Sequence, residues 1–441
     1  MMKTPDWTHA METCLQSQVI TADQPGPVLK DFGLILDYVG TKGVKSAGKY
    51  HLLPIACIPE LDPHLSRSLD LSLTLKRPQL RSHPYLQGLN LLLRASGLGR
   101  VEGTGAKSRL SLDPAMLEQW NRLNPTEQYF NLLEAWLLYG RPIMVGDSNG
   151  RRRGSMLSSC MQTWLFLPEN SRQVETRANG FIELIGISEG YYQLALMDLF
   201  GLMNVGQPPR GSERWLPTSL KPNPFGDAVF TLLAIKVDPF SGNVVSDEEQ
   251  EEDEATEEEE AEGEDSDEPE FGIWQSVFQP YFPEWQESLV FPKREAREGT
   301  FLFRVSLAPT LWRRIAMPAD STLDELVGWI LRAMKFDSDH LYMFTYTDSM
   351  GSKVSVSSPE SDEGPWTDEI SIGRLPLEPG QSMELLYDFG DCWRFTVKLE
   401  KIEPPNVKIK APGIVESHGA APKQYSNWDD EDEDEDQDEG E

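Results

Sequence analysis

The amino-acid sequence predicts a multidomain α+β protein, in which an acidic disordered linker joins a helical N-terminal region of tandem winged-helix-like modules to an α+β domain. Three observations predict this organisation. An acidic run interrupts the chain near its middle, Leu-rich amphipathic patterns fill the first half, and alternating apolar segments surround one amphipathic stretch in the second half. We therefore place the helical region at 1–245, the linker at 246–270, the α+β domain at 271–428 and an acidic disordered tail at 429–441.

The negative charge of the chain is concentrated in two short segments. The formal net charge is −32, and residues 247–270 carry 17 acidic and no basic residues, while residues 429–441 carry 11 acidic and none basic. Segments of this composition repel themselves and cannot bury enough apolar surface to offset the entropy of ordering, which predicts disorder. The remaining residues carry a net charge of −4, so the predicted domains are close to neutral.

Several classes of protein are excluded by composition. The N-terminus has no apolar core typical of a signal peptide, and no window approaches 18 uninterrupted apolar residues, so we expect neither secretion nor a membrane span. The four cysteines are far apart and form no CxxC pair, which argues against a zinc ribbon or a disulfide scaffold. We expect a cytoplasmic protein with no membrane partner and no cofactor.

The N-terminal half contains a weak internal repeat with a constant offset of 104 residues. The matching positions are Leu92, Leu93, Gly97, Leu98 and Val101 in the first copy, and Leu196, Met197, Gly201, Leu202 and Val205 in the second. In each copy an apolar helix ends at a glycine, a short hairpin follows, and the next helix starts at Asp113-Pro114 or Asn223-Pro224. This layout predicts a winged-helix module, and a third, shorter unit is predicted over residues 31–53.

The helix before the first hairpin is the one that would enter a DNA major groove. It is predicted over about 84–96, with its leucines inward and Gln87, Asn90 and Arg94 on one outer face. The hairpin adds Arg100, Lys107 and Arg109, and the run Arg151, Arg152, Arg153 could neutralise phosphates. These nine residues are the candidates for contact with nucleic acid, and the alternative is that they are ordinary solvated residues. The equivalent helix of the second copy, YYQLALMDLF, offers almost no basic or amide face and is typical of a packing helix.

The C-terminal half mixes strands with one clear helix. A strand is predicted from Thr300, and a capping box formed by Thr322 and Glu325 starts a helix with an apolar stripe from Leu323 to Met334. Further strands with period-two alternation follow from Leu341, and they end with SMELLYDF and WRFTVKLEKI. These elements predict a mainly antiparallel sheet covered by one main helix.

Several ordered motifs of this half resemble a known family. The segments FRVSL, LWRRIAMPADSTLDELVGWILRAM, HLYMF and LLYDFGDCWRFTVKLEKI are similar to the plasmid pRiA4b ORF-3-like domain over residues 299 to about 428. The resemblance implies association with plasmids and insertion elements, where some members carry a resolvase-type label. No serine-recombinase signature occurs in this sequence, so we do not expect a recombinase.

The motif YDFGD is the family feature that comes closest to a chemical site. It consists of Tyr387, Asp388, Phe389, Gly390 and Asp391, with Trp393 following. Its two carboxylates flank a Phe-Gly turn, so they could bind a metal together with His340 or His418, or they could simply cap a tight turn. The turn is the simpler interpretation, and we predict no metal and no catalytic residue here.

These observations leave two main hypotheses for function. In the first, the protein is a non-catalytic, mobile-element-associated accessory that binds double-stranded DNA through the first winged unit and an unknown protein partner through the C-terminal domain. In the second, it is a protein-only adaptor whose acidic runs attract partners or keep the chain in solution. A third hypothesis, a metal-dependent enzyme at YDFGD, rests on carboxylates alone.

Overall fold

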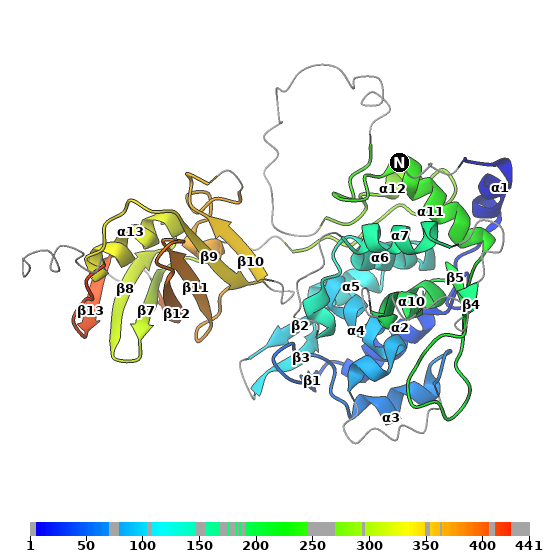
Figure 1. The fold of residues 1–441 in the computed structure, drawn as a ribbon, viewed down its shortest axis with the longest axis horizontal. Helices are drawn as coiled ribbons and strands as arrows, with labels where there is room; N and C mark the ends of the chain where they lie inside the picture. Colours follow the sequence, from blue (N-terminus) through cyan, green and yellow to red (C-terminus); the bar gives the residue numbers. More distant parts are fainter. Residues whose placement is uncertain are drawn as a thin grey trace, which may run out of the picture. The chain divides into compact units, whose positions relative to one another are not determined.

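The computed structural model describes residues 6–69, 79–103, 107–146, 155–167, 174–175, 182, 185–186, 190–245, 270–292, 296–348, 353–361, 364–404 and 411–424. The chain folds into two compact units, the first ending at Pro292 and the second beginning at Lys293 (Figure 1). The mixed α+β, multidomain class predicted from the sequence is confirmed.

The first unit contains two copies of one arrangement among the described residues: a helix, a strand, a second helix and a hairpin, with α3 as a further helix in the first copy. The first copy consists of α2 (Val28–Val39), β1 (Val44–Lys45), α3 (Cys57–Leu61), α4 (Pro84–Ala95), β2 (Gly99–Glu102) and β3 (Arg109–Leu112), with the short 3-10 helices η1 (Asp62–His64) and η2 (Leu80–Ser82). Its three strands are ordered β1-β3-β2, and Val44 pairs with Leu110. The prediction of a separate third unit is therefore wrong, because residues 31–53 supply the first helix and first strand of this copy.

The second copy repeats the first. It consists of α7 (Met156–Leu165), β4 (Val174–Glu175), α10 (Tyr191–Leu199), β5 (Met203–Gly206) and β6 (Ser219–Pro222), and α11 (Pro224–Lys236) follows it. Its strands are ordered β4-β6-β5, the same topology. Strands β2 and β5 start 104 residues apart, which is the offset of the predicted repeat.

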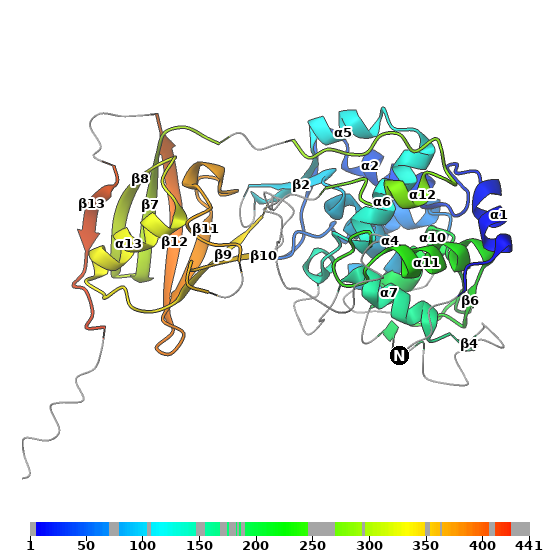
Figure 2. The ribbon, with the colours of Figure 1, turned by 90° about the horizontal axis from the view of Figure 1, so that it is seen from above.

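The two copies pack through their central helices, α4 and α10, which lie side by side in both views (Figures 1 and 2). Gly88 of α4 allows the close approach, since a Cβ atom placed there would lie 2.8 Å from Cγ of Leu196. The helix that would read DNA in the first copy is thus buried against its counterpart in the second.

Further helices among the described residues of this unit are α1 (His9–Ser17), α5 (Pro114–Trp120), α6 (Pro125–Leu137), η4 (Pro142–Val145) and α12 (Gln275–Phe278). Helix α6 begins with a capping box. The side chain of Asn124 accepts a hydrogen bond from the Glu127 amide, and the Glu127 carboxylate accepts one from the Asn124 amide.

Residues 270–291, here called the strap, belong to the first unit rather than to the C-terminal domain. The strap buries Trp274, Phe278 and Trp285 in the core of the first unit, and Trp285 stacks on Phe130 of α6 with ring centroids 4.6 Å apart. The predicted start of the C-terminal domain at residue 271 is therefore wrong. The aromatic residues after the acidic run complete the preceding core, and the boundary lies after Pro292.

The second unit is a seven-stranded antiparallel sheet with one main helix, as predicted. Its elements are β7 (Thr300–Ala308), β8 (Leu311–Pro318), α13 (Leu323–Met334), β9 (Tyr342–Thr347), β10 (Lys353–Ser357), η5 (Ile372–Arg374), β11 (Ser382–Tyr387), β12 (Trp393–Glu403) and β13 (Gly413–His418). The strand order is β10-β9-β11-β12-β7-β8-β13. Helix α13 lies across one face of the sheet and buries its apolar stripe there (Figure 2). Its predicted capping box, Thr322 with Glu325, is present.

No helix within the described residues combines the length and the apolar character needed to cross a lipid bilayer.

Candidate functional site

The predicted DNA-reading face of α4 is buried. Gln87, Asn90 and Arg94 are 7%, 0% and 1% exposed. Gln87 and Asn90 donate to the carbonyls of Val145 and Met144, at 3.0 and 2.8 Å, and Arg94 donates to the carbonyl of Tyr50 at 2.7 Å. The expectation that these three side chains face outward is wrong, because η4 and the segment around residue 50 cover this face and use its polar groups.

The basic residues of the first hairpin lie at the surface, and both arginines are already engaged. Arg100 forms ion pairs with Glu102 at 2.7 Å and Asp113 at 3.1 Å. Arg109 donates to the carbonyls of Lys42 and Gly43, and Lys107 is exposed. Arg151, Arg152 and Arg153 lie outside the described residues. The structure therefore brings together no cluster of free cations at this hairpin among the residues that it describes.

The YDFGD motif forms the tight turn between β11 and β12. Asp388 adopts a left-handed backbone with φ 58°, and its Oδ1 accepts hydrogen bonds from the amides of Gly390 at 2.8 Å and Asp391 at 3.2 Å. Tyr387 is fully buried and donates its hydroxyl to the carbonyl of Asp337. This geometry is what a side-chain cap of a turn requires.

The rest of the motif supports the turn or faces solvent. The Trp393 ring packs edge-on against Phe336 with centroids 4.8 Å apart, whereas Phe389 is about half exposed. His340 Nε2 lies 3.5 Å from Asp388 Oδ2, and His418 stacks on Trp312 at the far edge of the sheet. Across the described ranges, no three His, Cys, Asp or Glu side chains are grouped as a metal site would need.

The sheet face opposite α13 carries a row of cations that the sequence analysis did not single out. Three basic residues lie directly opposite one another on neighbouring strands: Lys398 of β12 faces Arg304 of β7, which faces Arg314 of β8. Arg314 is neutralised by Glu400 at 2.6 Å and by Glu416. The hydrogen bond with Glu400 raises the pKa of Arg314, although partial burial opposes this.

The other two cations of this row are not neutralised in the same way. Neither Arg304 nor Lys398 forms an ion pair with any residue that the structure describes. The Arg304 guanidinium lies over the Trp312 ring, 4.5 Å from its centroid, and His418 stacks on the same ring. Like charges directly opposite each other destabilise a sheet, so this row stabilises the fold less than a neutral pair would. This row could not be found from the sequence, because it depends on the strand register, which pairs residues 94 positions apart along the chain.

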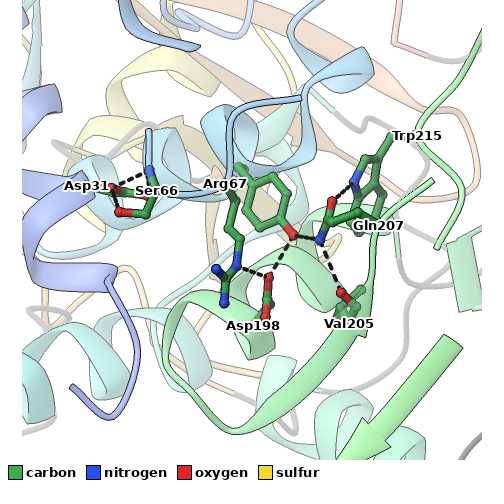
Figure 3. A network of polar contacts seen from close by, with 8 residues as sticks. Asp31, Ser66, Arg67, Asp198, Val205, Gln207 and Trp215 are labelled. Carbon is green, nitrogen blue, oxygen red and sulfur yellow. Dashed lines mark hydrogen bonds and ion pairs between the residues drawn. The ribbon is translucent and has the colours of Figure 1, made fainter. Parts of the chain in front are cut away.

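A second arrangement missed from the sequence is a hydrogen-bonded network in the first unit (Figure 3). Arg67 Nε donates to Asp198 Oδ2 at 2.9 Å, and the Tyr85 hydroxyl donates to the same oxygen at 2.8 Å. Gln207 donates to the Tyr85 hydroxyl at 2.6 Å and accepts from Trp215 Nε1 at 3.0 Å. The network joins residues that lie up to 131 positions apart, so no local pattern marks it.

The family match lies within the second unit. Residues 301–426 match the family described as plasmid pRiA4b ORF-3-like protein. The uncharacterized protein y4hQ of Sinorhizobium fredii (strain NBRC 101917 / NGR234) is 29% identical over an alignment of 123 residues, which covers 26% of this chain and 59% of that protein. A protein of unknown function from Methanosarcina mazei Go1, MM3350, is 25% identical in its crystal structure, with a TM-score of 0.26, over 28% of this chain and 72% of that one.

Proposed function

We propose that this chain, whose residues 301–426 form a plasmid pRiA4b ORF-3-like domain, is a non-catalytic adaptor that binds an acidic segment of a protein partner on the open face of its C-terminal sheet. The observation that carries the proposal is the opposed pair Lys398–Arg304, two cations that have no acidic partner among the residues the structure describes. The family is named after a plasmid gene product, which supports the hypothesis that this protein is associated with mobile elements.

The packing of the first unit favours a protein partner over DNA. A groove-reading helix must present amide and guanidinium groups to base edges. In α4 the residues that would do so, Gln87, Asn90 and Arg94, bind backbone carbonyls of their own unit. Double-stranded DNA would be left with phosphate contacts from the hairpin, where the arginines are engaged, so we treat duplex binding as an outcome of the test below.

The open sheet face is suited to an extended acidic segment. Trp312 holds the Arg304 guanidinium in place, so less side-chain entropy is lost when a carboxylate binds it. A carboxylate placed between Arg304 and Lys398 would also relieve their mutual repulsion. An exposed ion pair is worth about 0.2–1 kcal/mol, so two such pairs should raise the affinity by about twofold to thirtyfold.

The test is fluorescence anisotropy of the full chain with a labelled ten-residue peptide of alternating Glu and Thr, measured over a salt series. The variant R304S/K398S should weaken binding about tenfold at low salt. The control is R332S, since the Arg332 guanidinium also lies over a tryptophan, Trp329 at 4.9 Å, but sits on α13. A labelled random duplex is measured in parallel.

Equal peptide binding by the R304S/K398S and R332S variants would refute this site. Binding of the duplex but not of the peptide by the unaltered chain would refute the adaptor and restore the DNA hypothesis, with a salt slope that counts the phosphates contacted.

A further inference from the structure

The first unit contains a cavity of about 360 Å³ where the two repeats meet. Its lining comes from the segment before and at the start of α2, from residues 66–67, from the end of α10 with β5, and from the start of α11. Four charged side chains line it: Asp23, Lys30, Arg67 and Asp198. A cavity lined by both copies of a repeat and rich in charge differs from the apolar packing between α4 and α10.

Buried polar side chains hold the Arg67 side chain in place at the cavity. Asp198, whose side chain is only 4% exposed, receives hydrogen bonds from Arg67 Nε and from the Tyr85 hydroxyl. Asp198 lies in the last turn of α10, where the helix dipole disfavours a carboxylate. Its position is therefore unfavourable for the helix, and its two donors must compensate for it.

The backbone beside Arg67 is held from the opposite side. The carboxylate of Asp31, on α2, accepts hydrogen bonds from the amide of Ser66 at 3.0 Å and from its hydroxyl at 2.8 Å. The backbone beside Arg67 is thus bound to the first repeat, by the hydrogen bonds between Ser66 and Asp31, and its side chain is bound to the second repeat, by Asp198 (Figure 3). A side chain fixed at both its backbone and its Nε atom has a guanidinium with a defined orientation.

The outer edge of that guanidinium is available. The Arg67 side chain is 43% exposed, and its two terminal nitrogens form no hydrogen bond with a described residue. They lie on the side away from Asp198 (Figure 3). Lys30 lines the same cavity, and within the described residues its ion pair is with Asp23, at 3.4 Å, with both side chains more than half exposed. Such a pair is weak and can open to a competing anion.

We propose that this cavity binds a small oxyanion, a carboxylate or phosphate group, through both terminal nitrogens of Arg67. The planar guanidinium matches the two oxygens of such a group, and bidentate pairs of this kind are the strongest charge-assisted hydrogen bonds. Asp198 is the positioning residue, since it occupies Nε and leaves the outer edge to the ligand. Lys30 supplies the second positive charge. This site is separate from the sheet face proposed above, so either proposal can fail alone.

The test is isothermal titration calorimetry of the full chain with inorganic phosphate and, separately, with acetate, each at constant ionic strength set by sodium chloride. We expect saturable binding of at least one of the two anions, and the preferred one identifies the ligand class. R67K keeps the charge but loses the two-nitrogen edge, and it should weaken binding at least tenfold. R122A, which removes an exposed arginine paired with Glu118 on α5, is the matched control and should bind as the unaltered chain does.

A second variant guards against loss of folding in R67K. Y85F removes only the hydroxyl that donates to Asp198, leaves the Arg67 charge in place, and should weaken anion binding several-fold while the circular dichroism spectrum is unchanged. Two results would overturn the proposal: no saturable heat with either anion, or equal affinities for the folded R67K or Y85F protein and R122A.

Discussion

The attachment of the strap to α6 should make the first unit less stable as the pH rises from 6 to 8. Glu134 of α6 is fully buried and accepts hydrogen bonds from the amides of Gly272 at 2.6 Å and Trp274 at 2.8 Å. Burial raises the pKa of the Glu134 carboxyl to about 8, from a usual value of 4.5, although the two amide hydrogen bonds act in the opposite direction. Glu270 adds a negative charge that raises the pKa further.

The sign of the effect follows from proton linkage. Between pH 4.5 and 8 the folded protein keeps a proton on Glu134 that the unfolded chain has released, so each increase in pH favours unfolding. The slope approaches about 1.4 kcal/mol per pH unit while the folded group stays protonated, and it falls to zero above pH 8. The expected loss between pH 6 and pH 8 is about 2 kcal/mol of unfolding free energy.

Other groups with shifted pKa values contribute little between pH 7 and 8. Burial lowers the pKa of His51 and of His83, so these groups destabilise the folded protein only at a pH below this range. Burial raises the pKa of the Cys57 thiol to about 12, so its contribution is lost above pH 9. The interval from pH 7 to 8 therefore reports mainly on Glu134.

The measurement is urea unfolding of the full chain at pH 6, 7 and 8, followed by tryptophan fluorescence. The variant E134Q cannot ionise, so its unfolding free energy should depend little on pH. That free energy should be lower by a constant amount, because the Gln side chain can accept a hydrogen bond from only one of the two strap amides. The control E118Q changes an exposed carboxylate on α5 and should keep the slope. The reasoning fails if E134Q and the unaltered chain lose the same free energy between pH 7 and 8.

Three further outcomes are expected. G88A should destabilise the protein by about 1–3 kcal/mol, because its Cβ would lie 2.8 Å from Leu196 Cγ, and a rise in melting temperature would contradict this. W285A should cost about 3–5 kcal/mol, since it empties a buried site stacked on Phe130, and a loss below about 1 kcal/mol in urea unfolding would show that the strap does not complete the core. D388N should be nearly neutral, because Asn also tolerates a left-handed backbone and keeps the oxygen acceptor, while D388A should cost about 1–2 kcal/mol; equal losses in thermal unfolding would indicate that the carboxylate charge matters.

Local signals in the sequence were sufficient for much of the fold. The capping boxes at Asn124 and Thr322 place the starts of α6 and α13, because such caps satisfy backbone donors with side chains only three residues away. The repeat also follows from local pattern, since the glycines Gly97 and Gly201 end α4 and α10 with positive φ. Alternation along β11 and β12 gave the sheet that α13 covers.

The candidate site was harder to predict because its determinants are tertiary. Polar residues at helical spacing, such as Gln87 and Asn90, normally face water, but here segments more than 35 residues away supply the backbone groups that bind them. The residues of the strap were assigned to the wrong domain because an acidic run is a typical boundary. Only the four-residue spacing of Trp274, Phe278 and Phe282 indicated a buried surface.

The way the strap is held has a consequence for what happens when the chain is cut. Side chains of one helix face bind its backbone at both ends: Glu134 near residue 272, Glu127 at Gln286 and Glu287, and Asn131 at Leu289. Cleavage between residues 246 and 269 by a protease that prefers acidic sites would therefore yield two fragments that stay together and migrate as one particle in gel filtration. The covalent link through the acidic segment and the hydrogen bonds to α6 are independent, so the strap is joined in two ways to the rest of the first unit.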